Sequence, residues 1–382
     1  MSDSTYERYA DAVAKRFIDG LQDGGLWRRD WNVADVPRAH YNPTTGQPYR
    51  GGNQLMLMLS AWARQDDGID LKGDSRWMTY KQARKVGAHV RQGEKAVMLI
   101  SFKEVPKDEA LIAWEQAEGK YDGRDTRLMV KPFFVFHASQ IDGLPSPPQA
   151  PMREQVEINA ECQALVNRLS PNLSWGSYQT PHYLPGKDTI CMPEQASFES
   201  DGAYYAALMH ELGHWSGHKD RLDRNFGGSA GSEAYAKEEL RAEIASFMLC
   251  QRMGVQYAPE QHTRYVKSWV KILEDAPREI LRASADAEKI MAYLGVPEIA
   301  YEKLPEVERT AEASQAPEAA NEAQTKPEAV AAKAVVAKSK LSKSKAAAAR
   351  ARGKAKGKAR AKPAAKQRVP VKVKRKELEM SM

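Results

Sequence analysis

Two histidines and a glutamate in the second half of the chain have the types and spacing of a metal site. His210, Glu211 and His214 form the pattern H-E-x-x-H within an alanine- and aromatic-rich stretch, as expected of a buried helix. Residues four apart lie on one helical face, so both imidazoles can reach the same ion. Glu211 directly follows the first histidine and is placed to take a proton from a water molecule at that ion. The competing interpretation is a helix with two incidental histidines.

We therefore predict a divalent-metal site with His210 and His214 as ligands and Glu211 as the catalytic residue. We expect the metal to be zinc (Zn2+), with another divalent ion such as Mn2+ as the alternative. This donor set, two imidazoles and a nearby carboxylate, is the one that catalytic zinc sites use.

A catalytic site needs a third protein ligand, and two candidates compete for this role. His218 lies another four residues along the chain, about 6 Å further along the axis if the helix continues. Glu239 and Glu243 share a face of the next strong helix, which Leu240, Ile244, Phe247 and Met248 mark as largely buried. We favour Glu239 as the third ligand and place Glu243 behind a ligand imidazole, with His218 as the alternative ligand.

Periodicity predicts the elements that position these residues. In the second half we expect helices at 154–169, 201–213, 234–253 and 259–294, the last broken near Pro277, and a strand or hairpin at 182–192. In the first half we expect helices at 6–22, 54–65 and 79–87, and strands at 96–102 and 133–137. This mixture predicts an α+β fold, with a second domain that is mostly helical around a small sheet.

Composition divides the chain into two domains, a linker and a tail. Pro145, Pro147, Pro148 and Pro151 mark a semi-rigid linker, which we place at 144–153, between domains at 1–143 and 154–304. From residue 305 the sequence becomes rich in alanine and lysine, with little to bury, and predicts a disordered basic tail over 305–382. Residues 331–382 carry 18 Lys and Arg against two acids, so the total charge of +7 leaves −9 for residues 1–330. We expect the tail to bind nucleic-acid phosphates, in preference to acting as a spacer.

Other features of the composition indicate a cytoplasmic protein without a membrane segment. The three cysteines are widely spaced and give no disulfide framework, which fits a reducing compartment. The N-terminus is polar and charged, and no stretch approaches the ~18 apolar residues of a membrane helix.

A basic and aromatic segment in the first domain has the residue types of a single-strand-binding surface. Sequence-tolerant binding of single-stranded DNA combines aromatic side chains, on which bases stack, with cations that contact phosphates. By composition alone, a solvated basic helix is the preferred interpretation, and the same ambiguity applies to Trp27 and Trp31 beside Arg28 and Arg29. The candidate DNA contacts are Trp77, Lys81, Arg84, Lys85, Arg91 and Lys95.

Longer motifs in both halves carry a family resemblance. The run 210–218, followed by Arg221-Leu222 and 235–243, resembles the ArdC-type antirestriction proteins of conjugative plasmids and mobile elements. The first half is similar to the same family at 49–53, 77–83, 90–95 and 135–140, so that the resemblance covers roughly residues 6–296 in matching order.

The resemblance implies a single-stranded-DNA-binding domain followed by a zincin-like metallopeptidase domain whose third ligand is a glutamate. It thus supports Glu239 over His218, makes DNA binding by the first domain the preferred interpretation, and implies protection of incoming plasmid DNA from host restriction. The protein would then act in the cytoplasm and could accompany plasmid DNA into a recipient cell. The tail is not part of the family's usual core, so its role is not inherited.

Three functions remain in competition. The first is an antirestriction protein that binds single-stranded DNA and carries a zinc peptidase-like domain. The second is an active metalloprotease that DNA tethers to a protein substrate, either DNA-bound or from the host defence. The third is a DNA-coating protein whose metal is structural. Glu211 favours a site that performs, or once performed, hydrolysis, because a structural site requires no general base.

Overall fold

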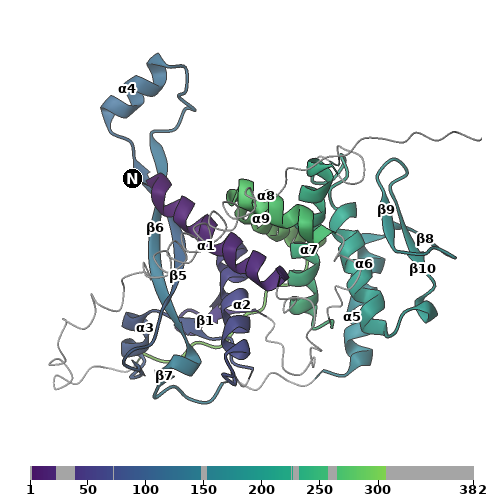
Figure 1. Cartoon of the computed structure of the whole chain (residues 1–382), viewed down its shortest axis with the longest axis horizontal. Coiled ribbons are helices and arrows are strands. Elements are labelled where there is room, and N and C mark those ends of the chain that lie inside the picture. Colours follow the sequence, from purple (N-terminus) through teal and green to yellow (C-terminus); the bar gives the residue numbers. More distant parts are fainter. Residues whose placement is uncertain are drawn as a thin grey trace, which may run out of the picture. The chain divides into compact units, whose positions relative to one another are not determined.

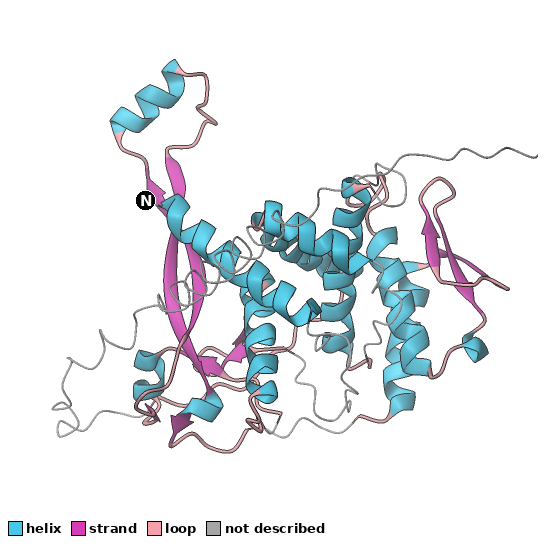
Figure 2. Ribbon diagram, viewed as in Figure 1, coloured by secondary structure: helices cyan, strands magenta, loops and turns pink. Residues whose placement is uncertain are grey.

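A computed structural model describes residues 2–22, 39–71, 73–147, 153–224, 226, 232–256 and 265–306. All of these belong to one compact unit, Met1–Lys326 (Figure 1). The predicted basic tail beyond Glu306, the Trp27 and Trp31 cluster, and Pro148 and Pro151 of the linker lie outside the described residues. The described part combines helices with several small sheets, which confirms the α+β prediction (Figure 2).

The first region is built on a three-stranded sheet in the order β3-β6-β5. β6 (Thr126–His137) is central and pairs antiparallel with both β3 (Trp77–Met78) and β5 (Val97–Pro106). The amphipathic helices α1 (Ser2–Gln22) and α2 (Gly51–Asp66) pack against this sheet and bury their apolar residues.

Short elements surround the sheet. β1 (Tyr41–Asn42) pairs with β2 (Gln47–Pro48), and β4 (His89–Val90) pairs with β7 (Ile141–Asp142). A 3-10 turn, η2 (Ala138–Gln140), follows β6. The helix α3 (Tyr80–Lys85) begins with a capping box, in which Thr79 and Gln82 satisfy each other's backbone amides.

β5 and β6 form a ribbon that is longer than the sequence predicts. The pairing runs without interruption from Val97 opposite Val135 to Pro106 opposite Thr126. Between the two strands the chain forms the helix α4 (Glu109–Ala117), none of whose residues is buried. Figure 1 shows this helix at the far end of the ribbon, away from the other helices. The predicted strands at 96–102 and 133–137 are therefore only the base of a projecting arm.

The second region is mainly helical, as predicted. After α5 (Gln155–Leu169), a sheet in the order β8-β10-β9 forms, with β10 (Thr189–Pro193) parallel to β8 (Asn172–Gly176) and antiparallel to β9 (His182–Leu184). A turn, η3 (Gln195–Ser197), precedes the long helices α6 (Asp201–Trp215) and α7 (Glu233–Met253). The predicted break near Pro277 separates α8 (Val266–Asp275) from α9 (Arg278–Leu294).

One hydrophobic core extends through both regions. It joins Tyr9 and Leu57 of the first region to Leu212, Leu249 and Ile290 of the second. α9 packs against α1 and α2 as well as against α7. The two regions thus share one core. Their division into separate domains at 1–143 and 154–304 stays a prediction. No helix among the described residues is long and apolar enough to cross a membrane.

Candidate metal centre

α6 presents the two predicted histidine ligands toward α7. Ser200 caps the start of α6 by accepting a hydrogen bond from the Ala203 amide, and the helix is buried along most of its length. At Gly213, a Cβ atom would lie 3.5 Å from the Cα of Ala242, in ordinary van der Waals contact. These two small residues let the axes of α6 and α7 approach closely, so that side chains from both helices meet between them.

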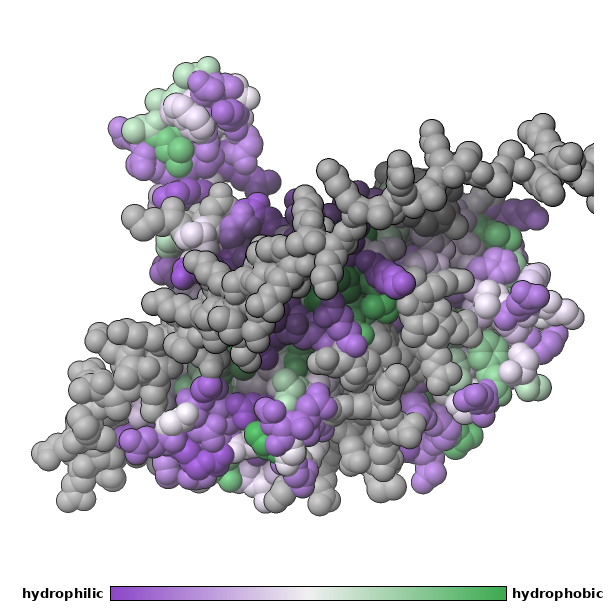
Figure 3. Space-filling view, in the orientation of Figure 1, coloured by the Kyte–Doolittle hydropathy of each residue, from purple (hydrophilic) through white to green (hydrophobic). Residues whose placement is uncertain are grey.

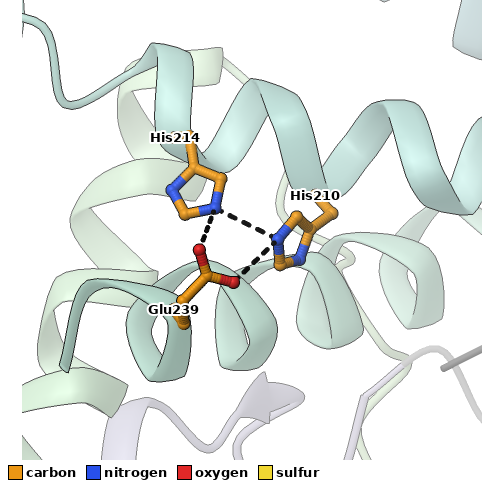
Figure 4. Close-up of side chains that lie close together, drawn as sticks. All are labelled: His210, His214 and Glu239. Atoms are coloured by element: carbon orange, nitrogen blue, oxygen red, sulfur yellow. Dashed lines mark hydrogen bonds and ion pairs between the residues drawn. The ribbon is translucent and has the colours of Figure 1, made fainter. Parts of the chain in front are cut away.

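His210, His214 and Glu239 meet there as a triangle of donor atoms (Figure 4). The two Nε2 atoms lie 3.1 Å apart, and the Glu239 carboxylate oxygens lie 3.5 Å from Nε2 of His214 and 3.8 Å from Nε2 of His210. Ligands bound at about 2.1 Å in a tetrahedral arrangement are separated by about 3.4 Å. The three buried side chains therefore fit a single divalent ion in both donor type and spacing.

A carboxylate also lies behind each imidazole. Glu243 approaches Nδ1 of His210 at 3.3 Å, and Glu238 approaches Nδ1 of His214 at 3.4 Å. The contact between His214 and Glu238 is a hydrogen bond, and a carboxylate beside Nδ1 orients the ring and leaves Nε2 to face the metal position. Sequence reasoning missed Glu238, although its place next to Glu239 on a buried helix was an available signal.

Arg224 holds Glu238 in place from the loop that follows α6. Its guanidinium pairs with the Glu238 carboxylate at 2.8 Å and donates to the Gly213 carbonyl at 2.6 Å. This guanidinium passes so close beneath Gly217 that a Cβ there would lie 2.7 Å from an Arg224 nitrogen. Gly217 therefore leaves room for the Arg224 guanidinium, which links α6 to α7.

The site is rich in negative charge. Glu211, Glu238, Glu239 and Glu243 are all buried around the two imidazoles, with the Arg224 guanidinium at one side. Burial lowers the pKa of His214, but the hydrogen bond with Glu238 and the charges of Glu239 and Glu211 outweigh it and raise that pKa to about 9. Burial raises the pKa of Glu238, yet the hydrogen bonds from His214 and Arg224 bring it below its ordinary value. Such surroundings favour a cation between the helices.

Glu211 and His218 have different positions relative to this triangle. Glu211 is buried on α6 between the two histidines in sequence, and its catalytic role stays a prediction. His218 lies beyond the end of α6, where its Nδ1 is 3.4 Å from the Asp220 carboxylate. Among the described residues, the group that could hold an ion contains Glu239 and not His218. The assignment of ligands stays a prediction.

Comparisons with known proteins identify the family. Residues 4–136 match the sequence model of the N-terminal domain of the anti-restriction factor ArdC, and residues 160–286 match that of a zincin-like metallopeptidase. The structure resembles that of the antirestriction protein ArdC from the R388 plasmid, with a TM-score of 0.58 and 31% sequence identity, over 75% of this chain and 96% of that chain. The chain belongs to the ArdC antirestriction protein family.

Relatives of known sequence extend this result. The chain is 32% identical to the uncharacterized protein y4eC of Sinorhizobium fredii, over 76% of this chain and 91% of that protein. It is also 39% and 38% identical to two DNA primases TraC of Escherichia coli, over 75% of this chain in each case. The chain spans only 20% and 27% of the lengths of these two primases.

The family comparison supports a divalent metal in this ArdC-family chain. The R388 protein has also been solved with Mn(II) bound, and that structure matches this one with a TM-score of 0.56. Together with the zincin-like region and the donor triangle, this supports a divalent-metal centre.

The predicted DNA contacts require one correction. Trp77 is 0% exposed, and its indole nitrogen donates a hydrogen bond to Nδ1 of His40 at 3.1 Å. Its ring therefore offers no face to a base, and the prediction that Trp77 is a stacking platform is wrong. Trp77 is buried because it lies on β3, which pairs with the central strand β6. The sequence pattern of an aromatic residue near basic residues does not predict this burial.

The basic candidates all lie on the surface of this ArdC-family chain, but their surroundings differ. Arg91 pairs with Glu94 and Asp142, and Lys85 pairs with Glu306. Lys81, Arg84 and Lys95 are also exposed. The structure thus leaves these five cations as candidates and removes their aromatic partner.

Proposed function

We propose that this chain is an antirestriction protein that binds single-stranded DNA through its first region and protects incoming plasmid DNA from host restriction. The family relationship is the observation that carries this proposal, since residues 4–136 match the model of the ArdC N-terminal domain, residues 160–286 match that of a zincin-like metallopeptidase, and the structure resembles ArdC over 75% of the chain. The cytoplasm is the proposed site of action, with transfer into a recipient cell beside plasmid DNA.

We further propose that His210, His214 and Glu239 hold a divalent ion, zinc in the first instance. The spacing of their donor atoms and the carboxylates behind the imidazoles support this assignment. A divalent metal in such a site lowers the pKa of water and polarises carbonyl groups. Glu211 then acts as the base that accepts a proton, while Glu238 and Glu243 keep the two imidazoles oriented.

A second candidate function is a DNA-tethered metalloprotease that cleaves DNA-bound or host defence proteins. Glu211 is the specific observation in its favour, because a buried general base beside three metal ligands is the arrangement of hydrolytic zincins. A DNA-coating protein with a structural metal would have no use for this carboxylate.

Replacement of Glu211 by glutamine separates these functions. The amide keeps the shape of the side chain but accepts no proton, so we expect metal binding to persist and any proteolysis to fall by at least about 100-fold. Restriction protection should remain at the wild-type level if protection depends on DNA binding. Proteolysis should be measured with and without single-stranded DNA, beside a plasmid-protection assay.

The matched control is Glu233→Gln, on an exposed residue at the start of α7. It should change neither readout. Loss of protection in Glu211→Gln, with DNA and metal binding intact, would contradict our first proposal and favour the protease.

A further inference from the structure

The arm formed by β5, β6 and α4 is a feature that the metal centre does not use. Val130, opposite Phe102, still packs against the hydrophobic core; beyond this pair the ribbon leaves the core, and Ser101, Phe102, Lys103 and Glu104 are all exposed. In the space-filling view the arm stands clear of the body and is largely hydrophilic, with apolar surface near its tip (Figure 3). A surface of this kind contributes little to stability, so its composition can serve binding.

Three cations share one face of this ribbon. Ser101 pairs with Lys131, Lys103 with Met129, and Val105 with Arg127. Directly opposed residues point to the same side of an antiparallel pair, and alternate pairs share that side. Lys103, Arg127 and Lys131 therefore lie on a common face, while Glu104 lies on the other face and accepts a hydrogen bond from Thr126.

These cations also lack neutralising partners. All three are exposed, and no acidic side chain among the described residues forms an ion pair with them. Two other cations of the first region differ in this respect, since Lys107 pairs with Glu115, and Arg91 with Glu94. An unpaired row of charge in water attracts a polyanion without first breaking an internal ion pair.

The spacing of the row suits an extended nucleic-acid strand. Alternate residues along a β-strand are about 7 Å apart. Phosphates along one strand of a stacked duplex are about 3.4 Å apart on the helix axis, and unstacking draws them further apart. The three cations are thus spaced for phosphates of a strand that has left the duplex stack.

The arm also supplies the exposed aromatic side chain that Trp77 does not. Phe102 lies next to the cation row in sequence, on the opposite face, where its ring is tilted against that of Tyr6 of α1 (centroids 6.3 Å apart) and still leaves 56% of the residue exposed. A single strand that passes over the edge of this two-stranded ribbon can contact the cations on one face with its phosphates and Phe102 on the other face with a base. Duplex DNA keeps its bases stacked inside and cannot offer one to Phe102. Trp114 of α4 is similarly exposed, but Lys120 covers its ring at 4.7 Å.

We propose that the β5–β6 arm is a single-stranded-DNA-binding element, in which Lys103, Arg127 and Lys131 contact phosphates and Phe102 stacks on a base. This inference rests on the proposed single-strand binding and assigns it to a surface outside the sequence-predicted contacts. The arm acts in addition to the basic residues of α3.

The first test removes the three charges in the full-length chain. The variant Lys103→Gln/Arg127→Gln/Lys131→Gln is compared with Lys187→Gln/Lys271→Gln/Lys289→Gln, which removes equal charge from exposed lysines of the second region. Binding to a labelled oligo(dT) of about 16 nucleotides is followed by fluorescence anisotropy between about 50 and 200 mM salt. Each lost phosphate contact lowers the slope of log affinity against log salt by about 0.7.

We expect the slope to fall by about 2 in the arm variant and to stay unchanged in the control. Over this fourfold change in salt, the wild type then loses about 18-fold more affinity than the arm variant. A wild-type slope in the arm variant, with wild-type protein still preferring single strands, would overturn the arm assignment alone. Equal wild-type affinity for single strands and duplex would instead overturn the proposed function.

The second test concerns the aromatic ring. Phe102→Leu keeps an apolar side chain but removes the stacking face, so the preference for single strands over duplex should fall about fivefold or more. The control Trp175→Leu changes an aromatic residue that is 51% exposed on β8 in the second region, and it should leave this preference unchanged. An unchanged preference in Phe102→Leu would overturn the stacking role.

Discussion

At the scale of single residues, the candidate metal centre depends on pairs of groups rather than on ligands alone. Each histidine presents Nε2 to the common position while its Nδ1 faces a carboxylate, Glu243 for His210 and Glu238 for His214. This arrangement fixes the ring orientation before a metal binds, which reduces the cost of organising the site.

The choice between Glu239 and His218 gives a direct prediction. Glu239→Ala removes one corner of the donor triangle and should weaken zinc or manganese binding by about 100-fold or more, beyond the loss expected for residues behind the ligands. His218→Ala should retain wild-type metal content, because its ring contacts Asp220 outside the triangle. Elemental analysis and metal titration of both purified variants provide the measurement. Retained metal in Glu239→Ala would remove it from the ligand set.

Local spacing explains which residues the sequence could identify. His210 and His214 are four residues apart on one helix, so their meeting requires no knowledge of the fold. Arg224 reaches Glu238 only because a loop folds back beneath Gly217, and no periodicity encodes that path. Trp77 shows the converse, since a favourable composition predicted an exposed ring where strand pairing buries it.

At the scale of elements, the junction of β3 and β6 carries a buried polar cluster in place of a DNA surface. Trp77 donates to His40, while His137 contacts the backbone carbonyl of Asp74 through Nε2 at 2.8 Å. Asp74 itself pairs with Arg76 at 2.7 Å. Burial lowers the pKa of His40 to about 3 and that of His137 to about 4, so both are neutral in the folded protein.

This cluster predicts that stability falls in mild acid. In the unfolded chain both histidines titrate near 6.5, so below that pH the unfolded state binds protons that the folded state does not. The stabilisation is complete above pH 6.5 and is lost as the pH falls toward 4. At pH 5.5 we expect a loss of about 1.4 kcal/mol for each histidine, measured by thermal unfolding of metal-free protein.

The variants for this measurement are His40→Gln and His89→Gln. The glutamine at position 40 keeps an acceptor for Trp77 but does not titrate, so the pH dependence should become shallower than in the wild type. His89 is an exposed histidine near Asp142, and His89→Gln serves as the matched control. Equal pH profiles for wild type and His40→Gln would contradict the neutral buried histidine.

The arm illustrates why elements can be harder to predict than sites. The apolar residues at the base of β5 and β6 predict strands there. The outer half of the ribbon contains charged residues such as Lys103 and Glu104, so its sequence does not predict a strand. α4 is amphipathic only weakly and buries none of its residues, so burial periodicity could not identify it. The core helices α6 and α7 were predicted nearly to their ends because they bury continuous faces.

At the scale of the whole described body, the two family regions are joined by packing and by a returning segment. The chain after α9 passes back to the first region, where Tyr301 stacks on Tyr41 with ring centroids 3.7 Å apart. Arg50 pairs with Glu298, and the Leu304 amide donates to the Pro43 carbonyl. Contacts between residues so distant in sequence tie the predicted DNA-binding region to the metal-binding region.

This shared packing predicts that the two regions unfold together. Leu281 of α9 is buried against Gly52 of α2, so close that a Cβ on the glycine would lie 2.7 Å from a Leu281 methyl carbon. Leu281→Ala should cost about 3 kcal/mol, since the packed helices can only partly fill the cavity. If both regions form one cooperative unit, a single calorimetric transition should shift down by about 5 °C, and amide protection in α2 and α6 should fall equally.

Leu128→Ala, on the exposed arm, should leave the transition in place. Two separate transitions, with only one sensitive to Leu281→Ala, would contradict this prediction and mean that the regions are independent domains. DNA binding by one region could then not affect the metal centre of the other through a shared core.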